Sequence, residues 1–261
     1  YGDLEYTTKE QGTVKCCAEY VYGDSVASYT PILIKPADGS PAEFIKIEDV
    51  VQYSTTREWI PGDSIGRNDK EYCEFTEGTM TWSEQGWTPL QRAIRHKLNP
   101  RKRMWRIMTP TGVVDVTDDH SLLREDGTEV SPKDLQVGTD LLHHILPFDD
   151  VDDVFKHLPT SVNTMVQRGF GEFYYNEFKG RSQLSAQQFY WKLKSMGYLA
   201  HISCNSMQQG GGYQILISNE VIRPHQIYQM YPLTAPDFAQ AYVYDLTTEN
   251  HHFYAGVGDG K

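Results

Sequence analysis

The chain has 261 residues, 39% of them hydrophobic and 12% aromatic, which is enough to form a folded core. Its formal net charge of -11 argues against a protein whose main task is to coat nucleic acid. Four cysteines are present without a CxxC pair, which favours a reduced, intracellular and cytoplasmic protein. We find no apolar run of about 18 residues and no signal peptide, so we expect no membrane partner.

Short runs rich in β-branched and aromatic residues predict a mainly β fold, because Gly, Pro, Asp and Asn separate them at close spacing. Six such runs are expected as strands: Pro31–Lys35, Glu43–Ile47, Arg103–Met108, Gly112–Val116, Tyr213–Ser218 and Ala241–Leu246.

One segment departs from this pattern, because its apolar positions from Ser185 to Met196 follow helical spacing. Ser185 and Gly197 are expected to cap this helix at its two ends. Two strands, Tyr198–Cys204 and Tyr213–Asn219, follow across a glycine-rich turn. A helix and a hairpin predict a small α+β insert in the β fold.

The stretch GVVDVTDDHSLLREDG, Gly112 to Gly127, combines a strand with a tight turn. A hydroxyl at Thr117 and an imidazole at His120 flank this turn, so both can act on one backbone group. The alternative is an ordinary turn with one structurally bonded histidine, and the spacing alone does not decide between them.

A second stretch, VYDLTTENHHFYAG, places Asp245 on a strand and two histidines after the following turn. His251 and His252 are expected to point to opposite faces, and we expect His252 to be exposed. The alternative is a hairpin with surface histidines and a carboxylate that only bonds to the backbone.

Two pairs of adjacent histidines, His143-His144 and His251-His252, raise the question of a metal site. Adjacent residues on a strand point to opposite faces, so neither pair easily binds one ion. We therefore expect no metal and no other cofactor.

Together these segments resemble an intein, a self-splicing protein insert. The run Ser25–Pro31 is similar to the start of inteins, where Ser or Cys precedes a short stretch and Thr-Pro. Four further matches follow in the family's order: Trp82–Lys97, Gly112–Leu123, Ser131–Leu142 and Val243–Gly258. The resemblance implies a hedgehog/intein (Hint) horseshoe-like β fold with a small α+β insert.

Two neighbouring segments resemble other families. EYVYGD, ending at Asp24, is similar to the first half of the Tyr-Gly-Asp-Thr-Asp-Ser metal motif of family B DNA polymerases. The helical segment resembles LAGLIDADG homing endonucleases, but their acidic motifs are missing, which implies a remnant. The domains implied are a polymerase-derived flank (1–24), the first part of the splicing domain (25–148), the insert (149–238) and the second part (239–261).

The resemblance implies autocatalytic, single-turnover splicing that begins with an acyl shift at the Asp24–Ser25 bond. Ser25 would be the nucleophile. Thr117 would donate a hydrogen bond, and His120 would protonate the departing nitrogen. Asp245 would accept a proton or assist the second transfer, and His251 would assist the last step.

That last step needs a terminal His-Asn before Ser, Thr or Cys, and residues 258–261 do not contain it. We therefore expect only N-terminal chemistry from the chain as written. The partners implied are the two flanking parts of a DNA polymerase, the exteins, and a complementary intein fragment.

Three alternatives remain. The first is weak DNA binding by the basic stretch Arg92–Arg106, which a solvated hairpin also explains. The second is hedgehog-like autoprocessing, which would use a cysteine nucleophile where this chain has Ser25. The third, an active polymerase fragment, lacks the second aspartate and the required size.

Overall fold

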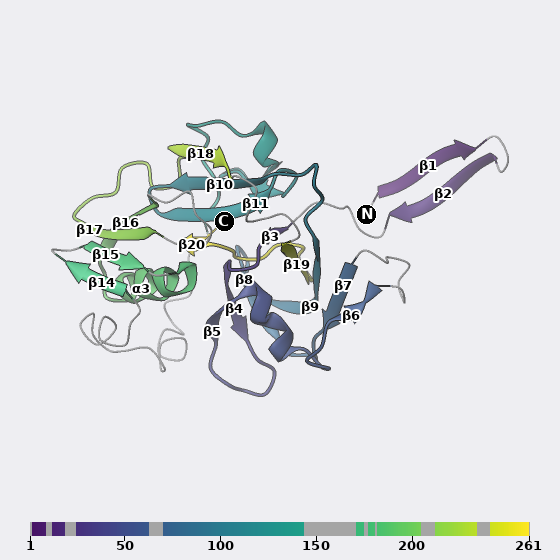
Figure 1. The fold of residues 1–261 in the computed structure, drawn as a ribbon, viewed down its shortest axis with the longest axis horizontal. Helices are drawn as coiled ribbons and strands as arrows, with labels where there is room; N and C mark the ends of the chain where they lie inside the picture. Colours follow the sequence, from purple (N-terminus) through teal and green to yellow (C-terminus); the bar gives the residue numbers. More distant parts are fainter. Residues whose placement is uncertain are drawn as a thin grey trace.

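The computed structural model describes residues 2–8, 12–18, 25–62, 70–143, 171–174, 177–180, 182–204, 212–233 and 241–260. Strands dominate these residues, so the prediction of a mainly β fold is confirmed. Figure 1 shows the main body with helix α3 (Gln183–Ser195) and a small sheet at one side of it.

A large twelve-stranded sheet forms most of the main body (Figure 1). Its path runs β18-β10-β11-β3-β19-β9-β8-β4-β5, and β20, β6 and β7 pair beside this path. In chain order its strands are β3 (Val26–Ala27), β4 (Pro31–Lys35), β5 (Glu43–Lys46), β6 (Ile60–Pro61), β7 (Lys70–Glu74), β8 (Met80–Ser83), β9 (Gly86–Lys97), β10 (Met104–Thr109), β11 (Gly112–Thr117), β18 (Gln229–Pro232), β19 (Tyr242–Thr248) and β20 (Val257–Gly258).

Three smaller sheets accompany it. A hairpin of β1 (Gly2–Thr8) and β2 (Gly12–Ala18) lies in the predicted polymerase flank, and β12 (Leu122–Leu123) pairs with β13 (Glu129–Val130). A four-stranded antiparallel sheet consists, in spatial order, of β14 (Gly171–Tyr174), β15 (Glu177–Gly180), β17 (Tyr213–Ser218) and β16 (Leu199–Cys204). Two 3-10 helices are η1 (Ile47–Tyr53) and η3 (Pro132–Asp134).

The six strands expected from the sequence appear as β4, β5, β10, β11, β17 and β19, with ends within two residues of the prediction. The hairpin expected after the helix is also present, because β16 pairs with β17 in antiparallel register. Runs of β-branched residues bounded by turn formers therefore located these strands well.

Helix α3 begins earlier than predicted, because Ser182 rather than Ser185 is its N-cap. The Ser182 hydroxyl accepts from the Ser185 backbone N–H at 3.1 Å, and the Ser185 hydroxyl accepts from the Ser182 N–H at 3.0 Å. This reciprocal pair is a capping box with serine at its third position. Gly197, with a φ of 82°, ends the helix as predicted, in the left-handed conformation that glycine tolerates best.

The small sheet and α3 share one hydrophobic core with the large sheet. Phe44 of β5 stacks on Trp191 of α3 at 6.3 Å between ring centroids, and it also contacts Tyr254 at 6.3 Å. Buried residues of both sheets, including Val113 and Ile202, belong to the same cluster. In addition, β18 lies inside the range 149–238 predicted for the insert but pairs with β10 of the large sheet. The exact borders of the insert remain a prediction.

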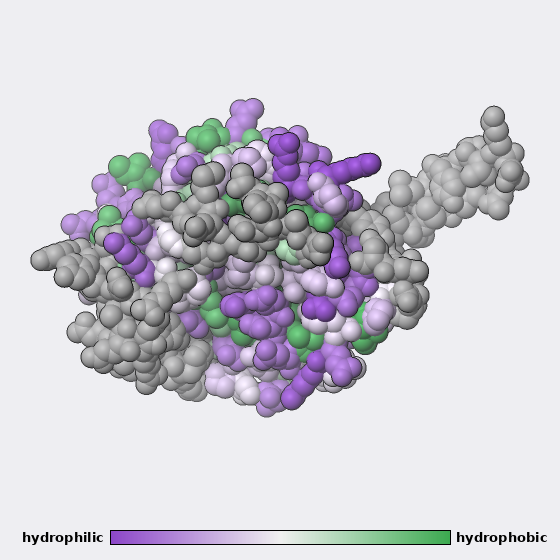
Figure 2. All heavy atoms as spheres, viewed as in Figure 1, coloured by the Kyte–Doolittle hydropathy of each residue, from purple (hydrophilic) through white to green (hydrophobic). Residues whose placement is uncertain are grey.

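A second core lies around the centre of the large sheet. Val26, Val116 and Tyr244, from three neighbouring strands, are all buried there. Hydrophilic side chains dominate the face seen in Figure 2, where hydrophobic residues form small separate patches. The buried centre of the sheet thus supports the residues at the ends of these strands.

Candidate active site

Strand β3 holds Ser25 in the middle of the large sheet. Val26 pairs with Val116 of β11 on one side and with Tyr244 of β19 on the other. The Thr117 backbone N–H donates to the Ser25 carbonyl oxygen at 2.9 Å and so extends the β11 ladder by one residue. Ser25 is only 2% exposed, so its neighbours shield it from bulk water.

The strand registers bring three predicted site residues into one row. Val26 pairs with Val116 and Tyr244, so the register places Ser25, one residue earlier, between two opposite residues. These are Thr117 on β11 and Asp245 on β19. Opposite residues on antiparallel strands direct their side chains to the same face of the sheet. Two hydroxyls and a carboxylate from three separate parts of the sequence therefore lie on one face of the sheet, with Ser25 between the other two.

His120 joins this group through the tight turn after β11. Its backbone N–H donates to the Thr117 carbonyl oxygen at 3.1 Å, so the turn closes as the sequence predicts. Thr117 is 1% exposed and His120 is 7% exposed. Burial makes hydrogen bonds from both side chains stronger than the same bonds in water.

Asp245 is the most accessible member of the row, because its side chain is half-buried. One of its carboxylate oxygens accepts from the next backbone N–H, that of Leu246, at 2.8 Å. This bond fixes the carboxylate beside the ladder. It corresponds to the backbone-bonded alternative considered from the sequence and leaves a functional role open.

The histidine pair after β19 differs from the prediction. His251 is exposed and has a left-handed backbone with a φ of 63°, and its N–H donates to the Thr248 carbonyl oxygen at 3.3 Å. His252 was expected to be exposed, but it is half-buried and its Nδ1 lies 2.8 Å from Glu84 Oε1. The left-handed turn reverses the alternation that a continuous strand would impose. The role of His251 in the last step remains a prediction.

Asp24, which carries the predicted scissile carbonyl, lies outside the described residues, and so does His144. The described part of the site thus begins at Ser25.

A buried ion pair stiffens β11 next to the row. Arg106 and Asp115 face each other in the β10–β11 register and make two hydrogen bonds of 2.8 and 2.7 Å. The Tyr29 hydroxyl donates to Asp115 at 2.7 Å, and the Gln183 amide of α3 donates to it at 3.1 Å. Because Asp115 precedes Thr117 by two residues on the same face of β11, this network fixes the strand that carries Thr117.

Burial shapes the protonation of this network. Burial lowers the pKa of Arg106, but its hydrogen bonds and charge interaction with Asp115 outweigh burial and raise the pKa overall. Burial, followed by the charge of Asp115, raises the pKa of Tyr29, which therefore remains a neutral donor. Arg106 thus keeps its positive charge at neutral pH, and Tyr29 keeps its proton.

Sequence reasoning missed this pair. The signal was present, because each strand, MWRIMT and GVVDVT, carries one charged residue in an apolar run. A lone buried charge is costly, so opposite charges in two consecutive strands predict that they pair.

Four cations of the basic stretch Arg92–Arg106 are buried or paired with acidic side chains. Arg106 is fully buried. Arg92 pairs with Glu74 at 2.7 Å, Arg95 pairs with Glu71 at 2.7 Å, and Lys102 pairs with Asp119. These acidic partners weaken the case for DNA binding, since phosphate contacts need unpaired cations on one face.

The chain is similar to solved structures of inteins. The alignment with the transcription factor IIB Mvu mini-intein covers 91% of this chain and 98% of the mini-intein, at 17% identity and a TM-score of 0.48. For the TvoVMA intein the coverage is 92% and 97%, at 15% identity and a TM-score of 0.46.

Two curated relatives are named DNA polymerase. The one from Acanthamoeba polyphaga mimivirus is 32% identical over 143 residues, 52% of this chain. The one from Thermococcus litoralis is 33% identical over 138 residues, 49% of this chain. The matches span 8% and 7% of these relatives' lengths.

No protein-family model matches the chain. Within the part of the chain that the structure describes, no helix has the length and apolar character needed to span a bilayer.

Proposed function

We propose that this chain is an intein of a DNA polymerase precursor and that it begins splicing with an acyl shift at the Asp24–Ser25 bond. The observation that carries the proposal is the row of Ser25, Thr117 and Asp245 across three neighbouring strands, with His120 one turn away. The relatives named DNA polymerase support a polymerase as the flanking partner.

In the first step, Ser25 Oγ forms a bond to the Asp24 carbonyl carbon, and the bond from that carbon to the Ser25 nitrogen breaks. The hydroxyl proton leaves Oγ and the nitrogen gains a proton, so an amide becomes an ester. The step is uphill because the starting amide is more stable than the ester that forms. The protein must therefore position the hydroxyl, stabilise the oxyanion and supply a proton to the leaving nitrogen.

Each of these tasks has a candidate. The ladder bond from the Thr117 N–H to the Ser25 carbonyl holds the nucleophile's backbone in place. The Thr117 hydroxyl would donate to the oxyanion or to the scissile amide. His120 would protonate the leaving nitrogen, because imidazole exchanges protons near neutral pH. Asp245 would take the proton from Ser25 or assist the second transfer.

Hydroxylamine tests the first step, because it intercepts an ester and leaves the peptide bonds of a folded chain intact. The chain contains no Asn-Gly pair, the peptide bond that hydroxylamine also attacks. We expect intact-mass measurements on the folded protein to show cleavage between Asp24 and Ser25.

Two variants make this test specific. Ser25→Ala should abolish the cleavage, whereas Ser28→Ala, in the turn after β3, should leave it unchanged. Absence of cleavage in the folded wild-type chain, or equal cleavage in Ser25→Ala, would contradict the proposed first step.

A further inference from the structure

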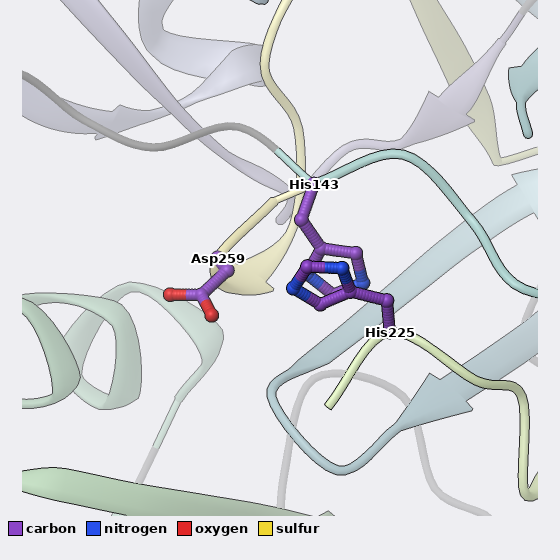
Figure 3. Close-up of side chains that lie close together, drawn as sticks. All are labelled: His143, His225 and Asp259. Atoms are coloured by element: carbon purple, nitrogen blue, oxygen red, sulfur yellow. The ribbon is translucent and has the colours of Figure 1, made fainter. Parts of the chain in front are cut away.

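Three metal-ligating side chains from distant parts of the sequence meet beside β20. His143 lies just after the Ser131–Leu142 segment, His225 lies before β18, and Asp259 directly follows β20. Their ligand atoms all lie within 4.8 Å of one another (Figure 3). The cluster contains none of the residues around Ser25, so it is separate from the candidate active site.

The two imidazole rings are already side by side. The rings of His143 and His225 stack with 4.1 Å between centroids and 15° between planes, as Figure 3 shows. His143 is buried, and its ring nitrogens lie 3.3 Å from the Thr111 hydroxyl and 3.5 Å from the Thr109 hydroxyl. Neighbouring groups thus hold the buried ring in one orientation.

Backbone hydrogen bonds fix the segments that carry the other two residues. The Leu141 N–H donates to the His225 carbonyl oxygen at 3.1 Å, which ties the segments of both histidines together. The Asp259 N–H donates to the Thr111 carbonyl oxygen at 2.8 Å. All three residues are therefore anchored to the same corner of the large sheet.

The Asp259 carboxylate has supporting contacts from α3 on one oxygen. The Tyr190 hydroxyl donates to Oδ1 at 3.0 Å, and the Lys194 ammonium lies 3.6 Å from the same atom. Both contacts address Oδ1, so Oδ2 can bind an ion while they are kept. Outer contacts of this kind orient the ligands of metal sites.

We propose that His143, His225 and Asp259 bind one divalent transition-metal ion with the preferences of Zn²⁺. Two imidazoles and one carboxylate are a common ligand set for zinc, and they leave a fourth position for water. Ligand atoms around a tetrahedral zinc ion lie roughly 3.3–3.5 Å apart, so the side chains have to close by about 1 Å. Rotations of the His225 and Asp259 side chains, which are both only partly buried, can supply this movement. The His225 ring must also turn out of its stack with His143, because the nitrogen lone pairs of stacked rings do not converge on one ion. One of the two threonine contacts of His143 is then exchanged for the ion.

The sequence-based expectation of no metal considered adjacent histidines only. This set instead joins a residue near the end of the predicted first part of the splicing domain, one after the insert hairpin and one directly after β20. A bound ion would tie these three segments together. The proposal does not depend on chemistry at Ser25, so the hydroxylamine test and the metal test can fail independently.

Metal titration of the full chain, stripped of metal with a chelator, tests the site. We expect one Co²⁺ per chain with the visible absorption of a low-coordinate ion, and displacement of that absorption by Zn²⁺. We also expect Zn²⁺ to raise the melting temperature, because a ligand that binds the folded state stabilises it.

Variants locate the site. Asp259→Asn and His225→Gln should each lower the Co²⁺ affinity more than roughly 100-fold, since loss of an outer-shell partner alone costs 10–100-fold. His252→Gln, which removes the other histidine–carboxylate contact, should leave it unchanged. Asn keeps an acceptor for Tyr190, so Asp259→Asn decides the question if His225→Gln does not fold by circular dichroism. No Co²⁺ binding by the wild type, wild-type affinity in a folded Asp259→Asn, or loss of binding in His252→Gln would overturn the proposal.

Discussion

Ser25 is surrounded by groups whose contributions to the proposed acyl shift can be separated by substitution. Thr117→Val removes the hydroxyl but keeps the backbone N–H that holds the Ser25 carbonyl. We expect the rate of hydroxylamine cleavage to fall by about 10²–10³-fold, the usual effect of losing one oxyanion donor.

His120→Gln should lower the rate of hydroxylamine cleavage by about 10²–10⁴-fold, because the leaving nitrogen loses its proton donor.

The matched control is Asp118→Asn, in the same turn between these residues. It should leave the rate close to that of the wild type. Wild-type rates in both Thr117→Val and His120→Gln, with unchanged circular dichroism, would contradict the assigned roles.

The buried pair of Arg106 and Asp115 is the second feature at the scale of single residues. Both side chains are fully buried, so Asp115→Asn would leave the Arg106 charge without its counter-ion. Removing one partner of a buried ion pair typically costs about 3–5 kcal/mol. We expect a loss of this size in the free energy of unfolding, measured by urea denaturation.

An exposed ion pair gives the comparison. Glu74→Gln removes the partner of Arg92, but Glu74 has 56% of its side chain exposed. Exposed pairs contribute about 0–1 kcal/mol, so this variant should unfold close to the wild-type midpoint. Equal losses in Asp115→Asn and Glu74→Gln would show that burial of the first pair has no energetic consequence.

Much of the candidate site could be predicted from local sequence, because motifs such as that around Thr117 and His120 combine a strand with a turn. The meeting of Ser25, Thr117 and Asp245 could not be derived from local pattern alone, since it depends on pairing between β3, β11 and β19. The exposure of His251 also could not be predicted from the sequence pattern, because its left-handed backbone changes the direction of the side chains in this turn.

At the scale of elements, side chains of α3 hold the strand β20 through hydrogen bonds to Gly258. The Gln187 amide oxygen accepts from the Gly258 N–H at 2.5 Å, and its nitrogen donates to the Gly258 carbonyl at 3.2 Å. Trp191 and Tyr254 also donate to that carbonyl, at 3.1 and 2.8 Å. Gly258 has a φ of 97°, and a Cβ there would overlap the Thr111 carbonyl oxygen, so glycine is required for this approach.

Gln187→Leu tests this contact. Leucine keeps the apolar contacts but leaves the buried Gly258 N–H without its acceptor, which costs about 1–3 kcal/mol. We expect a loss of that size in the free energy of unfolding. Gln188→Leu, next to it on the same helix and half-buried, should change the stability by less than about 0.5 kcal/mol. A similar loss of stability in both variants would argue against a specific role for the hydrogen bonds between Gln187 and Gly258.

The sequence located α3 through its apolar spacing, but not its start or its partner. Ser185 looked like the cap because the apolar positions begin there, whereas the capping box uses Ser182 as well. The polar residues Gln183 and Gln187 face the core because they bond across to the large sheet. Such long-range partners leave no trace in helical periodicity.

At the scale of the whole molecule, the two sheets depend on one core. Buried residues of α3 and the small sheet form one cluster with those of β4, β5, β10 and β11. We therefore expect the described body to unfold in a single cooperative transition. Thermal melts followed by far-ultraviolet circular dichroism and by tryptophan fluorescence should coincide.

Trp82 and Trp191 make this measurement informative, because one lies in the large sheet and the other in α3. Replacing each with Phe in turn should give the same midpoint by both probes. A separate, earlier transition that disappears with Trp191→Phe would mean that the insert unfolds on its own.

The pairing of β11 with both β3 and β20 has a geometric consequence for the two segments that the proposed splicing would join. Thr117 at one end of β11 holds Ser25, while Gly112 at the other end pairs with Gly258. Five residues of strand separate these points by about 17 Å. Both short strands run antiparallel to β11, so the chain at Gly258 heads away from Ser25. If splicing proceeds as proposed, a continuation of the chain would have to reverse direction and cover at least about five extended residues before it could meet the ester formed on Ser25.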